Sequence, residues 1–326
     1  MTAPYPLVFV PQLKPKVWGG GRLAGLGKAV PSGVSVGESW EVCDLDETSA
    51  SGGGGGRARS VIANGPLSGR TIREAIDQWG DALLEHRRLM AGAFPLLVKY
   101  LDARENLSVQ VHPSEAYARV HPGAHLKTEA WYVVEAEPGS EIHAGLRPEV
   151  TRAGLESRRR GEGFEAGLVD DLIHRPARVG ECHVLPSGTC HARGGGVLVA
   201  EVQTPSDTTF RMYDWGREAG GGRSLHPDEA LECAALGPAP GVTRGPGRLA
   251  TTPFFTIDEW RLDGRVTGKE GCSILMVVEG QGRLEWEDGP SRGELALGRG
   301  TTALIPAKIG SLARLDGRGT VLCIGV

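Results

Sequence analysis

Short apolar runs that alternate with glycine- and proline-rich turns dominate this chain. Of its 326 residues, 49 are glycine and 21 are proline. After residue 253 the runs FFTIDEW, CSILMVVEG, GRLEW, TALIPA and TVLCIGV recur about every ten residues, which is typical of a β-sandwich or small barrel. So many tight turns leave little room for long helices. The sequence therefore predicts a mainly β protein.

A linker divides the chain into two parts. The stretch GPAPGVTRGPG at 237–247 separates an N-terminal domain, expected at 1–240, from a C-terminal β domain, expected at 248–326. Helical insertions are expected in the first domain at about 66–92, where apolar residues recur at spacings of 3 and 4, and at 147–176. The strands of that domain are predicted at 37–45, 94–102, 107–112, 129–136, 181–186, 196–204 and 208–213, and residues 7–18 are expected to form a strand, a turn broken by proline and a short apolar segment.

Composition excludes several classes of protein. The formal net charge of −4 and the pI of about 6.2 indicate neither a nucleic-acid partner nor an anionic membrane. No apolar run approaches the ~18–20 residues that span a bilayer, and no signal pattern opens the chain, so a cytoplasmic location is expected. The six cysteines are scattered without a CxxC pair, and we interpret them as reduced core thiols.

One predicted strand has an unusual polar face. In NLSVQVHPSE (106–115) the side chains of Ser108, Gln110 and His112 share one face, because residues two apart on a strand point the same way. All nine histidines of the chain lie at or before His226. Any chemistry based on histidine therefore belongs to the N-terminal domain.

Two further segments carry polar residues that a strand does not bury without a reason. Lys127-Thr128-Glu129 opens the strand EAWYVVEA, and a G-x5-P-x-G-x2-H pattern ends at His191. If these strands line one barrel, Gln110, His112, Glu129 and His191 converge. Two imidazoles, a carboxylate and an amide oxygen suit a borderline divalent metal such as Zn²⁺. Three or four protein ligands with open positions describe a catalytic rather than a structural site.

The G-x5-P-x-G-x2-H pattern is the second cupin motif, whereas the first cupin motif fits poorly because Gln110 replaces its first histidine and Glu129 lies far beyond. With this changed first motif, the sequence resembles the type I mannose-6-phosphate isomerases (phosphomannose isomerases) in their short bacterial form. The segments that are similar to that family, in its order, are KPKVWGG (14–20), GESWEV (37–42), FPLLVKYLDARENLSVQVHP (94–113), KTEAWYVVEAEPG (127–139), PSGTCHA (186–192) and AEVQTPSDTTFRMYDWGR (200–217).

The resemblance implies two cupin-type jelly-roll lobes with a small helical insertion, the C-terminal lobe being free of metal. It implies one Zn²⁺ per chain, bound by Gln110, His112, Glu129 and His191. The implied catalytic residues are Arg211, Lys127 and Asp207, and the implied substrate-binding residues are Ser108, Lys127, Trp18 and Glu38. The implied reaction interconverts mannose 6-phosphate and fructose 6-phosphate through a cis-enediol in a monomer or homodimer.

Several alternatives stay open. The general base is undecided. The cation that binds the phosphate is also undecided, because this chain, like the short bacterial members, lacks the lysine that longer members carry soon after the arginine. Arg211 could instead form a structural ion pair with Asp207 or Asp214, Trp18 could be a core aromatic, and Glu38 could face solvent. An Fe²⁺-dependent cupin dioxygenase and a non-catalytic sugar-binding cupin are the competing functions.

Overall fold

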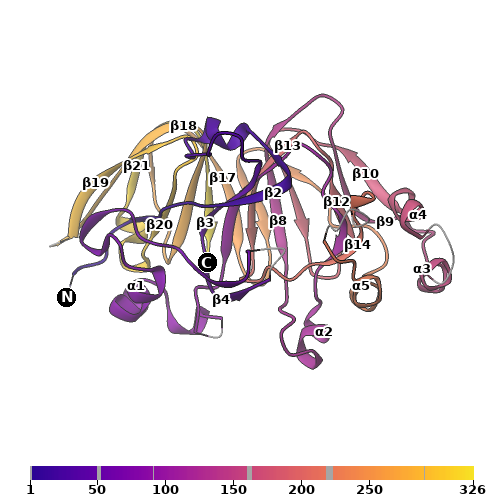
Figure 1. Cartoon of the computed structure of the whole chain (residues 1–326). Helices are drawn as coiled ribbons and strands as arrows, with labels where there is room; N and C mark the ends of the chain where they lie inside the picture. Colours follow the sequence, from indigo (N-terminus) through magenta and orange to yellow (C-terminus); the bar gives the residue numbers. More distant parts are fainter. Residues whose placement is uncertain (1, 50–52, 91, 160–163, 218–222, 290) are drawn as a thin grey trace.

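The computed structural model describes residues 2–49, 53–90, 92–159, 164–217, 223–289 and 291–326. Antiparallel sheets dominate these ranges and lie side by side, with helices confined to the ends of the molecule (Figure 1). The prediction of a mainly β fold with cupin-type lobes and a minor helical part is confirmed.

The N-terminal lobe is a sandwich of two sheets. Its central sheet has the order β15 (Thr243–Arg244), β11 (Glu181–Leu185), β8 (Glu129–Ala136), β13 (Val197–Gln203), β6 (Leu97–Ala103), β2 (Gln12–Gly20) and β3 (Val36–Val42). The facing sheet has the order β10 (Leu172–Pro176), β9 (Glu141–Leu146), β12 (His191–Arg193), β7 (Val109–Val111) and β14 (Phe210–Tyr213). Apolar side chains from both, among them Trp18, Leu101, Trp131 and Ile142, fill the space between them.

The C-terminal lobe packs against the other face of the central sheet. Its strands follow the order β1 (Leu7–Val8), β20 (Thr302–Ile305), β18 (Ser273–Asp288), β21 (Arg314–Gly325), β17 (Thr256–Thr267) and β16 (Gly247–Thr251), with β19 (Ser291–Gly298) paired to β18. Tyr100 and Tyr132 of the central sheet share one buried cluster with Ile274 and Leu322 of this lobe. The N-terminal strand β1 thus forms an edge of the C-terminal sheet, where it pairs with β20.

The helices cover two separate regions. The helices α3 (Arg152–Arg159), α4 (Phe164–Asp171) and α5 (Pro227–Cys233) lie at the right-hand end of the molecule near β9, β10 and β14, and α2 (Glu115–Val120) projects from its lower edge (Figure 1). Leu155, Leu168 and Ala230 of these helices belong to one buried cluster with Leu146 and Met212 of the facing sheet. The helix α1 (Ile72–Trp79) instead joins the core near the C-terminal lobe, and β4 (Asp44–Thr48) and β5 (Gly56–Arg59) form a separate hairpin.

The predicted helical segments are shorter than expected. Thr71 and Glu74 form a capping box that starts α1, but Gly80, at φ 51°, ends it, and only short 3-10 turns follow. In the 147–176 segment the last residues are β10, which pairs with β9. The expected turn between CSILMVVEG and GRLEW is also wrong. Both runs lie in β18, and a bulge between Val277 and Glu279, next to Gly280 at φ 78°, bends the strand without reversing it.

The six cysteines are all free and buried, which confirms their prediction as reduced core thiols. No helix in the described part of the chain has the length and apolar character needed to cross a membrane.

Candidate active site

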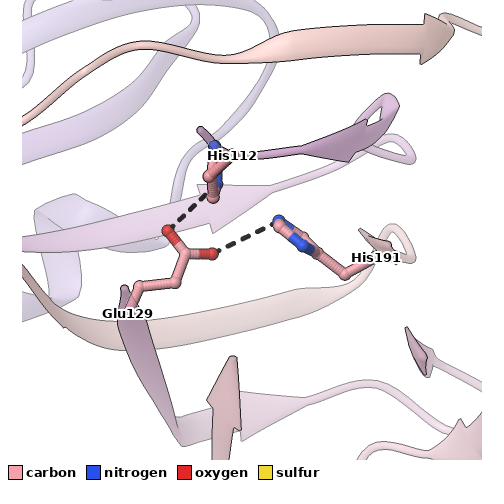
Figure 2. Close-up of side chains that lie close together, drawn as sticks. All are labelled: His112, Glu129 and His191. Carbon is pink, nitrogen blue, oxygen red and sulfur yellow. Dashed lines mark ion pairs between the residues drawn. The ribbon is translucent and has the colours of Figure 1, made fainter. Parts of the chain in front are cut away.

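Four side chains from three separate segments meet between the two sheets of the N-terminal lobe. Gln110 in β7 lies directly opposite His191 in β12, and His112 follows two residues later on the same face. Glu129, the first residue of β8, reaches them from the central sheet. Its Oε2 lies 3.3 Å from His112 Nε2, and its Oε1 lies 3.3 Å from His191 Nε2 (Figure 2). All four side chains are at least nine-tenths buried.

The hydrogen bonds of the two imidazoles fix which nitrogen faces the carboxylate. His112 Nδ1 lies 3.1 Å from the carbonyl oxygen of Thr208, and His191 Nδ1 lies 2.8 Å from that of Thr189. A carbonyl oxygen only accepts, so each Nδ1 carries the proton and each Nε2 presents a lone pair to Glu129. For His112 Nε2 no hydrogen-bond partner exists among the described residues. Two acceptors in contact repel each other unless a cation lies between them.

The separations between these atoms match a metal coordination sphere. Tetrahedral bonds of about 2.0–2.2 Å place the ligand atoms about 3.3–3.6 Å apart. Gln110 completes the set, because its Nε2 lies 3.1 Å from His191 Nε2 and its Oε1 accepts from Ser108 Oγ at 3.0 Å. Exchanging the amide oxygen and nitrogen, which have nearly the same shape, turns the oxygen toward the other three donors and keeps the bond to the serine hydroxyl. The residues therefore fit a divalent metal.

The protonation states also suit metal binding. Burial, with a smaller contribution from Lys127, lowers the pKa of His112 to about 3, and burial lowers the pKa of His191. Burial alone would raise the pKa of Glu129, but the charge of Lys127 and the neighbouring imidazoles hold it well below its ordinary value. Neutral imidazoles and an ionised carboxylate are the forms that bind a metal.

A second group of possible metal donors lies elsewhere, on the hairpin of β9 and β10. Glu141 Oε2 lies 3.2 Å from His143 Nε2 and 3.3 Å from His174 Nδ1. In contrast to the site at Glu129, the Glu141 and His174 side chains are 43% and 30% exposed, and the two rings stack. This group lines none of the pocket described next.

A pocket opens beside the metal donors and encloses about 530 Å³, part of it open to solvent. Lys127 lies in its wall, with Nζ 2.8 Å from Glu129 Oε2. The sequence-predicted residues Trp18, Glu38, Asp207 and Arg211 also line it. The structure thus brings these residues together with Gln110 and Glu129 around one space.

Three of the expected residues have additional structural contacts. Glu38 is buried rather than solvent-facing, and it accepts from Trp40 Nε1 at 2.7 Å. Asp207 Oδ2 accepts from the backbone nitrogens of Ser49 and Gly53 at 2.8 and 2.9 Å, so this carboxylate holds the chain that follows β4. Ser108 is fully buried behind Gln110 and lies outside the pocket lining. Its observed contact is the hydrogen bond that orients the amide of Gln110.

Arg211 does not form the structural ion pair considered as an alternative. Among the described residues no carboxylate lies within ion-pair distance of its guanidinium, and Asp214 pairs with Arg217 and Arg223 instead. Arg211 lies opposite Gln110 in the β7–β14 register, so its side chain shares the face of the metal donors. A buried guanidinium without a carboxylate partner is suited to an anionic ligand.

Four charged residues that line the pocket were not predicted from the sequence, namely Lys16, Lys99, Glu201 and Arg223. Lys99 of β6 and Glu201 of β13 are register partners, and Lys99 Nζ lies 3.1 Å from Glu201 Oε1. Trp131 Nε1 donates to the other oxygen of Glu201 at 2.9 Å. The signal was present in the sequence, because a lysine within LLVKYL and a glutamate within VLVAEV interrupt apolar strands that are otherwise buried on both faces.

Comparisons with known proteins identify relatives of this chain. A family model described as the catalytic domain of type I phosphomannose isomerase matches residues 8–143. The mannose-6-phosphate isomerase of Streptococcus mutans is 35% identical over 297 residues, which cover 86% of each chain, and the mannose-6-phosphate isomerase ManA of Bacillus subtilis is 34% identical over 299 residues, which cover 86% of this chain and 87% of that one.

Solved structures extend the similarity to the whole chain. The crystal structure of the mannose 6-phosphate isomerase from Bacillus subtilis superposes with a TM-score of 0.81 at 28% identity, covering 98% of this chain and 99% of that one. The apo form of the Salmonella typhimurium mannose 6-phosphate isomerase, at 18% identity, shares the fold with a TM-score of 0.69 over 100% of this chain and 99% of that one. The chain belongs to the type I phosphomannose isomerase family.

Proposed function

We propose that this protein interconverts mannose 6-phosphate and fructose 6-phosphate. The observation that carries the proposal is the buried set of Gln110, His112, Glu129 and His191, with lone pairs that converge beside a pocket containing Lys127 and Arg211. The identity of the substrate is inferred from the relatives named mannose-6-phosphate isomerase.

The four donors would hold one Zn²⁺ per chain. Two imidazole nitrogens together with oxygen donors favour a borderline ion over Mg²⁺ or Ca²⁺, which prefer oxygen ligands alone. When bound, such an ion supplies Lewis-acid polarisation of an oxygen atom.

The reaction requires a balanced movement of protons. The open-chain aldose loses a proton from C2 while O1 gains one, which forms the enediol. The ketose then forms when O2 loses its proton and C1 gains one. Lys127 is the candidate group for these transfers, because its Nζ lies in the pocket beside Glu129. Asp207, which also lines the pocket, is the candidate for assisting ring opening.

Arg211 would stabilise the negative charge that develops on O1 and O2. Burial, followed by the charge of Arg223, lowers the pKa of Arg211 to about 10, so it stays charged at neutral pH. A fixed cation aimed at a developing oxyanion typically contributes ~100- to 1,000-fold in rate. Trp18 and Glu38, which also line the pocket, are proposed to contact the sugar.

The competing functions have less support. A cupin dioxygenase needs neither Lys127 nor Arg211, and the matching relatives are named as isomerases. A sugar-binding protein without catalysis does not require a buried donor set with neutral imidazoles and an ionised carboxylate.

A coupled assay tests the proposal. Mannose 6-phosphate is added to the metal-replete protein, and fructose 6-phosphate is followed with time. We expect turnover that stops after chelation and returns when Zn²⁺ is added. No turnover by metal-replete, folded protein would overturn the isomerase assignment, and undiminished turnover by protein shown to be free of metal would overturn the metal requirement.

A further inference from the structure

The pocket contains more positive charge than the proposed chemistry uses. Its wall carries five cationic side chains, Lys16, Lys99, Lys127, Arg211 and Arg223, against the carboxylates of Glu38, Glu129, Glu201 and Asp207. Asp207 already accepts from the backbone, and Glu129 belongs to the metal donors. A divalent ion at that site would increase the excess of positive charge. The pocket is therefore suited to a ligand with more than one negative charge.

Two arginines supply much of this excess. Arg211 and Arg223 line the same pocket, and after burial the charge of Arg223 is the largest cause that lowers the pKa of Arg211, which shows that the two like charges repel each other. Arg211 has no carboxylate within ion-pair distance among the described residues, and its Nε is buried without a hydrogen-bond partner. An anion that contacts both groups would remove this repulsion.

Asp214 fixes the direction of the Arg223 side chain. Arg223 Nη2 donates to Asp214 Oδ1 at 2.7 Å and Arg223 Nε donates to Oδ2 at 3.3 Å, while Asp214 itself is 1% exposed. These bonds form a bidentate fork and leave Nη1 for another ligand. Lys16 lines the same pocket, with its Nζ 3.5 Å from Glu38 Oε1. Burial lowers the pKa of Lys16, the charge of Glu38 opposes this, and Lys99 and Arg223 add smaller contributions that lower it.

Arg217 provides a natural comparison. It also donates to Asp214 Oδ1 at 2.7 Å, and its side chain is 20% exposed, as is that of Arg223. However, Arg217 Nη2 also donates to the Asn106 carbonyl oxygen at 2.8 Å, and its Nη1 lies 3.5 Å from Glu105. Of these two arginines only Arg223 is among the described residues that line the pocket.

We propose that Arg223, held in place by Asp214, binds the phosphate group of the substrate together with Lys16, and that Arg217 does not. The inference rests on the proposed function for the identity of the substrate, but not for the presence of an anion site. It assigns the phosphate subsite of this chain to a residue twelve positions after Arg211, beyond 200–217, the last segment that resembles the family.

The test compares two arginines that share one carboxylate. Arg223→Gln is expected to raise KM for mannose 6-phosphate at least ~10-fold, since one charge-assisted contact to a phosphate is lost, with kcat changed less than ~3-fold. The Kd for inorganic phosphate, measured by titration calorimetry, should rise by a similar factor. Arg217→Gln should leave KM and this Kd within ~2-fold of the wild type.

Arg223→Lys gives a second measurement that does not depend on the folding of the glutamine variant. Lysine keeps the charge but loses the fork to Asp214, so KM should lie between those of the wild type and Arg223→Gln. An unchanged KM and phosphate Kd in folded Arg223 variants would overturn the inference, as would an equal rise in Arg217→Gln. If the wild type binds phosphate through Arg223 but does not turn over mannose 6-phosphate, the proposed function fails and the anion site stands.

Discussion

At the scale of single residues, the two histidine Nε2 atoms and the carboxylate of Glu129 are all acceptors, so their contacts are unfavourable without a cation between them. The backbone carbonyls of Thr208 and Thr189 hold the Nδ1 protons of His112 and His191, and this orients both Nε2 lone pairs toward the oxygens of Glu129. Carbonyl acceptors of this kind orient histidine ligands in metal sites generally. The backbone therefore prepares the site before any ion arrives.

Glu129→Gln is the first residue-scale prediction. The amide keeps the size of the side chain but removes the charge that neutralises a cation, so bound metal should fall from one per chain to well below 0.1 and kcat/KM should fall at least ~100-fold. Metal analysis and the coupled assay measure both. Glu141→Gln, which alters the exposed group of Glu141, His143 and His174, is the matched control and should change neither quantity. Full metal content in Glu129→Gln would contradict the ligand assignment.

The second residue-scale prediction concerns how the stability of the metal-free protein depends on pH. In the folded chain the pKa of His112 is about 3, whereas an unfolded histidine has a pKa of about 6.5. Between these values the unfolded state binds a proton that the folded state does not, so stability is full above pH ~6.5 and is lost as the pH falls. One such group contributes up to ~1.4 kcal/mol per pH unit.

The measurement is the free energy of unfolding of chelator-treated protein between pH 7.5 and pH 5. We expect His112→Asn to lose stability less steeply than the wild type over this interval. Equal slopes would show that His112 is protonated in the folded chain.

At the scale of elements, the pairing of β1 with β20 joins the two ends of the chain. Leu7 lies opposite Leu304 and is fully buried, although no local signal in the sequence sets this register. Leu7→Ala should lower the free energy of unfolding by about 2–5 kcal/mol, because it leaves a cavity in the shared core. Val10→Ala, at a position that is 52% exposed, should change it by less than ~0.5 kcal/mol in the same denaturant titration. Similar effects of the two substitutions would contradict the packing of β1.

Some elements could be predicted from the sequence and others could not. Alternation placed Gln110 and His112 on one face of a predicted strand and Glu129 at the start of another, because the side-chain period of a strand is local information. His191 was identified from the second cupin motif, and its strand β12 was not predicted. The merging of two runs into β18 could not be foreseen, since a glycine at positive φ permits either a turn or a bulge and the pairing with β21 decides between them. Lys99 and Glu201 were missed because their pairing spans about a hundred residues of chain.

At the scale of the whole molecule, both faces of the central sheet are covered by other strands. One face meets the facing sheet and the metal donors, and the other meets the C-terminal lobe, where Tyr132 donates to Glu259 at 2.7 Å. The strand that carries Glu129 is therefore held by packing on both of its faces. We infer that the C-terminal lobe, which has no histidine, supports the geometry of the site from behind.

The position of the bound metal tests most directly whether Gln110, His112, Glu129 and His191 are its ligands. Anomalous diffraction at the zinc absorption edge from crystals of the zinc-loaded protein should give one strong peak per chain. We predict that this peak lies about 2.0–2.3 Å from His112 Nε2, His191 Nε2 and an oxygen of Glu129, with the Gln110 amide oxygen turned toward it. A loaded crystal with no peak there, or with its main peak beside Glu141, His143 and His174, would contradict it.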